Sequence, residues 1–86
     1  MKLNPFAVMA EQFDGTGLVF EPESNSAVAV NKTGVFLWNL LKEGRSEQEM
    51  AAALLDRYDG VTPEKAAADV KAFLDQLRAR SLISED

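Results

Sequence analysis

Apolar residues in the first thirty positions occur in short runs that turn residues separate. The runs from Phe6 to Phe13 (FAVMAEQF) and from Leu18 to Glu21 (LVFE) flank Asp14-Gly15-Thr16-Gly17. An Asp-Gly pair between two apolar runs indicates a β-hairpin. A second turn-rich stretch, 22–26 (PESNS), leads into the uncharged run Ala27–Val30. The pattern therefore predicts a three-stranded antiparallel meander whose third strand lies at an edge of the sheet.

From Asn31 onward the apolar spacing becomes helical. Asn31 can cap a helix with its side-chain oxygen, and Gly44 is a typical residue just beyond a helix end. The apolar positions between them lie on one side of the predicted helix: Phe36, Leu37, Leu40 and Leu41. Trp38 sits beside this side and is expected to cover the core rather than to anchor a partner.

Two further helix starts follow. Ser46 and Glu49 form the capping-box pattern S-x-x-E, and this second helix ends at Asp59-Gly60. Thr62-Pro63 begins a third helix, because proline is favoured at the first helical position. Its predicted inner face consists of Ala67, Val70, Leu74 and Leu77, with Ala66 and Phe73 widening it on one flank. Leu82 or Ile83 is expected to return the chain end to the core.

The order of these elements predicts one α+β domain over residues 1–86, a three-stranded antiparallel β meander followed by a three-helix bundle. At 86 residues the chain can bury one core but offers little room for a deep two-sided cleft. A binding module is therefore favoured over an enzyme. The N-terminus has no signal-peptide pattern and no run reaches membrane-spanning length, so we expect a cytoplasmic protein without membrane contact.

Residue content removes most catalytic chemistry from consideration. The chain has no cysteine and no histidine, which excludes disulfides, thiol nucleophiles, imidazole bases and the usual zinc sites. It also lacks a Walker loop, a G-x-G-x-x-G run and a calcium-loop pattern. We therefore expect no catalytic residue, no metal site and no cofactor. Nine basic against fourteen acidic residues give a net charge of -5, which disfavours nucleic acid as a partner.

Taken together, these motifs resemble the PqqD-like peptide chaperones, also called precursor-peptide (RiPP) recognition elements, which are small winged-helix-like domains. The resemblance covers roughly the whole chain. Its matching pieces are Asn31-Lys32-Thr33-Gly34, Phe36-Leu37-Trp38, Leu40-Leu41, Glu43-Gly44-Arg45-Ser46, Met50, Leu54, Tyr58, Asp69-Val70, Phe73-Leu74, Leu77 and Leu82-Ile83. Two positions depart from the family pattern: Val30 stands where leucine is usual, and Ser81 where glycine is usual.

The resemblance implies a non-catalytic function in natural product biosynthesis. Such a protein binds the leader segment of a ribosomally made precursor peptide and presents it to a modifying enzyme, often a radical S-adenosylmethionine (radical SAM) enzyme. In the family the leader adds as a strand to the third strand and packs into the groove between that strand and the third helix. Strand addition suits an uncharged edge that lacks proline.

The predicted peptide-binding residues come from these two elements. In the third strand, alternation puts Val28 and Val30 on one face and Ala27 and Ala29 on the other. The residue pattern by itself favours burial of the whole strand, whereas the resemblance favours an open edge. The full predicted set is Ala27, Val28, Ala29, Val30, Ala66, Val70, Phe73 and Leu77.

Two other functions fit the same elements. Three helices and a small sheet are also the architecture of winged-helix nucleic-acid-binding regulators, although the third helix mixes acidic with basic residues. An exposed strand edge can also mediate self-association, so the protein is expected to be a monomer or a homodimer. Lys71 and Arg78 are each spaced to pair with Asp75, which explains them without a ligand. The sequence of the precursor peptide and the identity of its modifying enzyme cannot be read from this chain.

Overall fold

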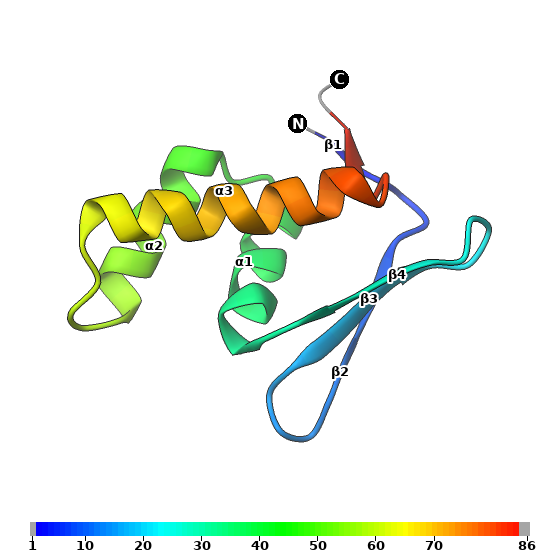
Figure 1. The fold of residues 1–86 in the computed structure, drawn as a ribbon, viewed down its shortest axis with the longest axis horizontal. Helices are drawn as coiled ribbons and strands as arrows, with labels where there is room; N and C mark the ends of the chain where they lie inside the picture. The colour runs from blue at the N-terminus through cyan, green and yellow to red at the C-terminus, as the bar shows by residue number, and fades with distance from the viewer. Residues whose placement is uncertain (1, 85–86) are drawn as a thin grey trace.

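The computed structural model describes residues 2–84 of the chain. Within that range its elements follow the predicted order, with one additional short strand at each end. They are β1 (Lys2–Leu3), β2 (Val8–Glu11), β3 (Gly17–Glu21), β4 (Ser26–Val30), α1 (Lys32–Lys42), α2 (Glu47–Arg57), α3 (Pro63–Ala79) and β5 (Ile83–Ser84). Figure 1 shows the helices gathered on one side of the molecule and the sheet extending from α1 on the other.

The predicted meander is confirmed. β2, β3 and β4 form an antiparallel sheet in the order β2-β3-β4, so β4 is an edge strand. β2 is shorter than the predicted run from Phe6 to Phe13 at both ends. At its start, the Asn4 side chain accepts a hydrogen bond from the Phe6 N–H at 2.9 Å, which forms a turn. At its end, Phe13 belongs to the loop that Gln12 and Thr16 close.

A second sheet joins the two ends of the described chain. β1 pairs antiparallel with β5, with Lys2 opposite Ser84 and Leu3 opposite Ile83. The Asn4 N–H also donates to the Leu82 carbonyl at 2.9 Å. Strands this short carry no periodic pattern, which is why the sequence did not indicate them. Leu82 and Ile83 are 0% and 4% exposed, so the expected return of the chain end to the core is confirmed.

The three helices begin at the predicted caps. Asn31, Ser46 and Thr62 each accept a hydrogen bond from a backbone N–H of the first turn. Ser46 and Glu49 complete the reciprocal capping box. α2 ends at Arg57, slightly before the predicted Asp59-Gly60 stop. None of the helices within residues 2–84 has the length and apolar character of a membrane-spanning segment.

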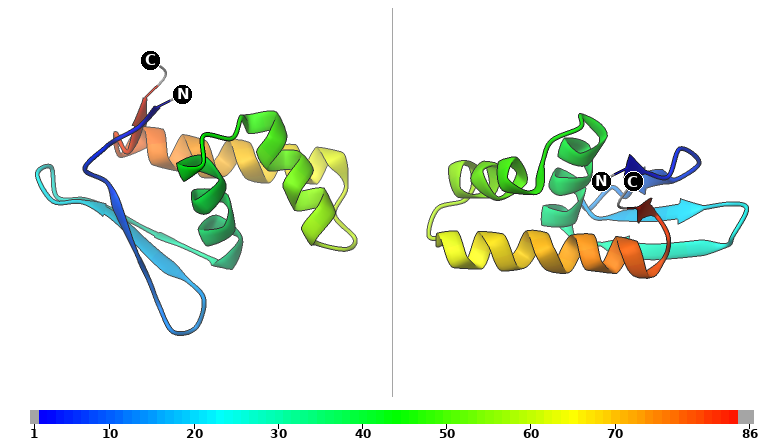
Figure 2. Two further views of the ribbon diagram at one scale, coloured as in Figure 1. Left: turned by 180° about the vertical axis from the view of Figure 1, so that it is seen from behind. Right: turned by 90° about the horizontal axis from the view of Figure 1, so that it is seen from above.

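The core lies between the inner face of the sheet and the three helices. Trp38 is 2% exposed and packs in this core, as expected. On α3 the predicted inner face is wrong at one position, because Ala67 is exposed and Ala66 is completely buried. Seen from above, α3 lies along one side of the molecule, and β4 is the strand of the β2-β3-β4 sheet that lies on the α3 side (Figure 2).

Candidate functional site

The edge of β4 that faces away from β3 is open. In residues 2–84 no strand pairs with β4 on that side. An uncharged edge strand without proline is a ready template for pairing with another chain, and natural proteins usually protect such edges. β4 therefore offers backbone hydrogen-bonding groups to a ligand.

The hairpin geometry determines which residues of β4 present those groups. Gln12 donates its N–H to the Thr16 carbonyl at 2.7 Å, so these two residues form a hydrogen-bonded pair. Alternate residues of an antiparallel strand bond to opposite neighbours, so every second residue of β3 from Gly17 onward bonds to β4. Their partners in β4 are Val30, Val28 and Ser26. The N–H and C=O groups of Ala27 and Ala29 consequently point to the open edge.

A groove of about 510 Å³ runs along this edge. One wall is the end of β4 and the first turns of α1, and the other is α3. The residues that line it are Ala29, Val30, Asn31, Thr33, Gly34, Leu37, Lys65, Asp69, Ala72, Phe73 and Gln76. In Figure 1 β4 runs into α1 beneath α3, which brings strand and helix together at the groove.

A close approach of α1 to β4 shapes the base of the groove. The Asn31 Oδ1 accepts the Gly34 N–H at 2.8 Å, which starts the helix immediately after the strand. A Cβ atom added at Gly34 would lie 2.8 Å from the Val30 Cβ, closer than real carbon atoms pack. Glycine in the junction Asn31-Lys32-Thr33-Gly34 therefore allows the helix to start directly against the strand.

The predicted site residues fall into two groups. Ala29, Val30 and Phe73 line the groove, and Ala27 is exposed on the same strand. Val28 is 7% exposed, with its side chain toward the core. Ala66, Val70 and Leu77 are each 0% exposed and pack in the core, so in this structure they support the wall from behind without reaching its surface. The role of all eight residues in binding stays a prediction.

Sequence reasoning missed most of the α3 wall. The missed residues are Lys65, Asp69, Ala72 and Gln76. They form a stripe displaced by one position from the buried stripe of Ala66, Val70, Phe73 and Leu77. Residues three and four apart share a helix face, so this spacing was a readable signal. The sequence did not show that this second stripe of α3 faces the open edge of β4 instead of water.

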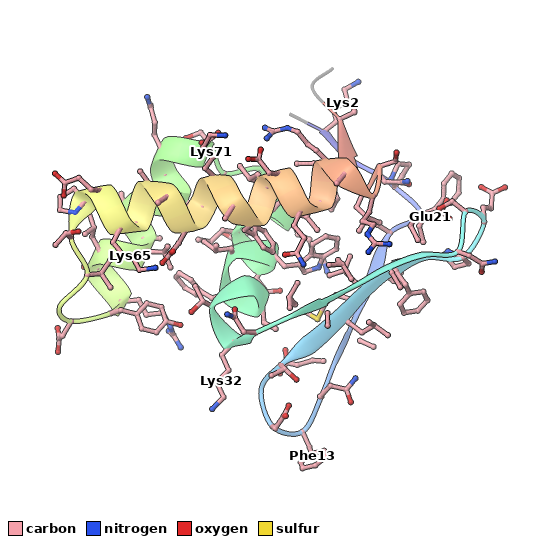
Figure 3. All side chains as sticks on the ribbon, viewed as in Figure 1. Lys2, Phe13, Glu21, Lys32, Lys65 and Lys71 are labelled. Atoms are coloured by element: carbon pink, nitrogen blue, oxygen red, sulfur yellow. The ribbon has the colours of Figure 1, made fainter. Side chains whose placement is uncertain are left out.

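One ion pair lies in the groove. The Lys65 Nζ is 2.6 Å from the Asp69 Oδ1, and Lys65 and Lys71 project from opposite sides of α3 (Figure 3). Away from the groove, Lys71 and Arg78 both pair with Asp75, as expected. The hydrogen bond from Lys71 lowers the pKa of Asp75. Within residues 2–84 no three acidic side chains gather closely enough to hold a metal ion.

Two of the three comparisons with known proteins give matches. The family model of coenzyme PQQ synthesis protein D (PqqD) matches residues 17–83. A search of curated protein sequences gives no significant match.

Two solved structures share the fold. TbiB1 in complex with the TbiA(beta) leader peptide has a TM-score of 0.86 and 23% identity, over 100% of this chain and 98% of that chain. Lasso peptide synthetase B1 complexed with the leader peptide has a TM-score of 0.78 and 22% identity, over 95% of this chain and 93% of that chain. The family model spans most of the chain, including β3, β4 and all three helices, and the chain therefore belongs to the PqqD family.

Proposed function

We propose that this protein binds the leader segment of a ribosomally made precursor peptide and presents it to a modifying enzyme without catalysing the modification. The leader adds as a fourth strand to β4 and places alternate side chains in the groove beside α3. The observation that carries the proposal is the open edge of β4, where the backbone groups of Ala27 and Ala29 face outward beside the groove.

Membership of the PqqD family and the two structural neighbours support this function. Both neighbours were solved with a leader peptide bound. In strand addition the main-chain hydrogen bonds supply affinity and side-chain pockets select the register. The groove offers apolar contact at Leu37, Ala72 and Phe73 and polar contact at Asp69 and Gln76. We infer that the partner enzyme is a radical SAM enzyme, as is common for this family.

Nucleic-acid binding has no comparable support. Lys65, Lys71 and Arg78 on α3 each pair with a carboxylate of the same helix. The basic side chains of a recognition helix contact DNA, whereas these three contact carboxylates of their own helix. The net charge of -5 also opposes approach to a phosphate backbone.

Proline at an outward-facing position of β4 tests the proposal. Ala29→Pro removes one N–H from the open edge but none from the β3–β4 ladder, so the variant should fold and lose peptide binding. Glu11→Pro is the matched control. By the same alternation Glu11 turns its N–H away from β3, at the opposite edge of the sheet.

The measurement begins by capturing the natural peptide from an extract of the source organism on immobilised protein and sequencing it. A synthetic, fluorescent copy is then titrated with the parent and both variants. We expect at least about a tenfold loss of affinity for Ala29→Pro and little change for Glu11→Pro. Equal affinities for the parent and a folded Ala29→Pro variant, or no peptide bound by the parent, would contradict the proposal.

A further inference from the structure

The face of the β2-β3-β4 sheet that points away from α1 carries only apolar side chains. Pairing brings six of them into two adjacent rows, which we call the outer sheet face: Val8, Phe20 and Ala27 in one row, and Ala10, Leu18 and Ala29 in the other. The alternate residues of β3 and β4 are buried or half-buried on the core side. An antiparallel sheet with one face in water normally has polar residues on that face. The outer sheet face has none within these strands.

Two of the exposed large hydrophobic residues, Val8 and Leu18, lie on this face. The full set in residues 2–84 is Phe6, Val8, Phe13, Leu18 and Leu55, and all but Leu55 belong to β2, β3 or the turns next to β2. Phe13 is fully exposed and points away from the molecule at the tip of the β2–β3 turn (Figure 3). Contiguous exposed apolar surface marks interaction sites in soluble proteins.

The size of the face argues against a stable homodimer as its occupant. Strands ~4.8 Å apart with ~3.3 Å per residue give the three strands a projected area of roughly 250 Å². A stable interface usually buries about 800 Å² on each partner. The face alone is too small for lasting self-association, but it suits a partner whose contact extends beyond this chain.

The proposed peptide strand supplies that extension. Ala27 and Ala29 have their side chains on the outer sheet face and their free backbone groups at the open edge. A strand added there continues the outer sheet face, because its alternate side chains project to the same side. A protein docked on this face therefore touches the bound peptide as well.

We propose that the outer sheet face is the docking surface of the modifying enzyme. The enzyme presents an uncharged, apolar surface that covers Val8, Leu18 and Phe20. The same surface contacts the peptide side chains that project to the outer sheet face. This inference rests on the proposed function, since the occupant is the protein that receives the peptide. Its consequence is that the enzyme binds the peptide-loaded form of this protein more tightly than the empty form.

Site-specific crosslinking provides the first test. Benzoylphenylalanine replaces Leu18 in one variant and Leu55 in another; both leucines are 38% exposed, but Leu55 lies on α2. Each variant is loaded with the synthetic leader peptide and irradiated in an extract of the source organism. The protein that crosslinks through position 18 is identified, produced pure and titrated against parent, Leu18→Thr, Leu18→Lys and Leu55→Lys chains. Leu18→Thr introduces a β-branched residue, which strands favour, so this variant should fold even if Leu18→Lys does not.

The expected result is that the crosslinked protein is the enzyme that modifies the peptide. Both Leu18 variants should then bind it at least about tenfold more weakly, whereas Leu55→Lys binds it like the parent. Peptide affinity should stay unchanged in every folded variant, which separates enzyme docking from leader binding. The inference is overturned if position 18 crosslinks nothing or only a second copy of this chain, or if the enzyme binds the Leu18 variants normally. A parent that binds no peptide contradicts the proposed function and removes this inference with it.

Discussion

Ser81 adopts a backbone conformation that a serine side chain disfavours. Its φ is 59°, in the left-handed region that favours glycine. The Leu82 N–H donates to the Leu77 carbonyl at 2.9 Å and the Ser81 N–H to the Arg78 carbonyl at 3.0 Å, which together make a Schellman motif at the end of α3. The same motif ends α1, where the left-handed position is Gly44 with φ 85°. The departure from the family's glycine at position 81 is thus a local strain.

Exchanging these residues should change stability in opposite directions. Ser81→Gly relieves a left-handed conformation that costs a residue with a Cβ atom roughly 1–2 kcal/mol, less the extra entropy of glycine in the unfolded chain. We expect the free energy of unfolding to rise by about 0.5–1 kcal/mol. Gly44→Ser should lower it by a similar amount, because nothing lies within 4 Å of the added Cβ and only the backbone opposes it. Urea unfolding measures the free energy of unfolding of both variants. A lower value for Ser81→Gly than for the parent would show that Ser81 is not strained.

Glu49 makes the stability of α2 dependent on pH. Its Oε1 accepts the Ser46 N–H at 2.8 Å, and this hydrogen bond lowers the pKa of Glu49 below its ordinary value of 4.5. A carboxyl whose pKa is lower in the folded state stabilises the fold above its unfolded pKa and ceases to do so as the pH falls through its folded pKa.

The test is to compare the parent with Glu49→Gln, which keeps a side-chain acceptor but cannot ionise. The parent should be more stable at pH 7, and the difference should shrink as the pH falls below 4.5 and through the lowered folded pKa of Glu49. Thermal unfolding at several pH values measures the difference. Protonation of other acidic residues lowers the stability of both proteins in acid. The difference between the two proteins at each pH therefore isolates the contribution of Glu49. If the difference in stability between the parent and Glu49→Gln stayed constant with pH, the ionised form of Glu49 would be excluded as its cause.

At the scale of elements, the sequence predicted the helix starts and the β-hairpin, because these depend on local residue patterns. The caps Asn31, Ser46 and Thr62 and the hairpin around Asp14-Gly15 act through neighbouring atoms, so residue patterns locate them. Tertiary arrangement was less accessible. The β1–β5 pair depends on two chain ends meeting, and the groove wall on α3 depends on which of two adjacent stripes packs inward. On α3 the predicted site therefore named the buried stripe, of which only Phe73 also lines the groove.

A bulky side chain on that lining stripe should close the groove. Ala72 is exposed and lines it, so Ala72→Trp places an indole where the peptide's side chains are proposed to lie. Peptide affinity should fall at least about tenfold while stability changes by less than about 1 kcal/mol, because an exposed helix position tolerates tryptophan. Ala67→Trp is the matched control on the exposed surface of α3 outside the groove. Fluorescence anisotropy with the leader peptide compares them; equal affinities would exclude this wall from the site.

At the scale of the whole molecule, the two ends of the described chain are held together. β1 and β5 pair, and the segment between α3 and β5 buries Leu82 against the core while its carbonyl receives the Asn4 N–H. Residues 2–4 are therefore held in place by residues 82–84. Because small domains are only marginally stable, a single buried residue at this junction contributes a large part of the total free energy of unfolding.

Leu82→Ala tests how much of the fold depends on this junction. Removing a fully buried leucine side chain costs about 2–5 kcal/mol, and each kcal/mol shifts Tm by about 4–8 °C in a domain of this size. We expect Tm to fall by at least about 10 °C and the amides of residues 2–4 to lose hydrogen-exchange protection together with β5. Leu55→Ala, at a leucine that is 38% exposed, should cost less than about 1 kcal/mol. If both variants lost the same stability, or if β1 stayed protected in Leu82→Ala, the ends would be held by the strand pairing itself and Leu82 would be an ordinary core residue.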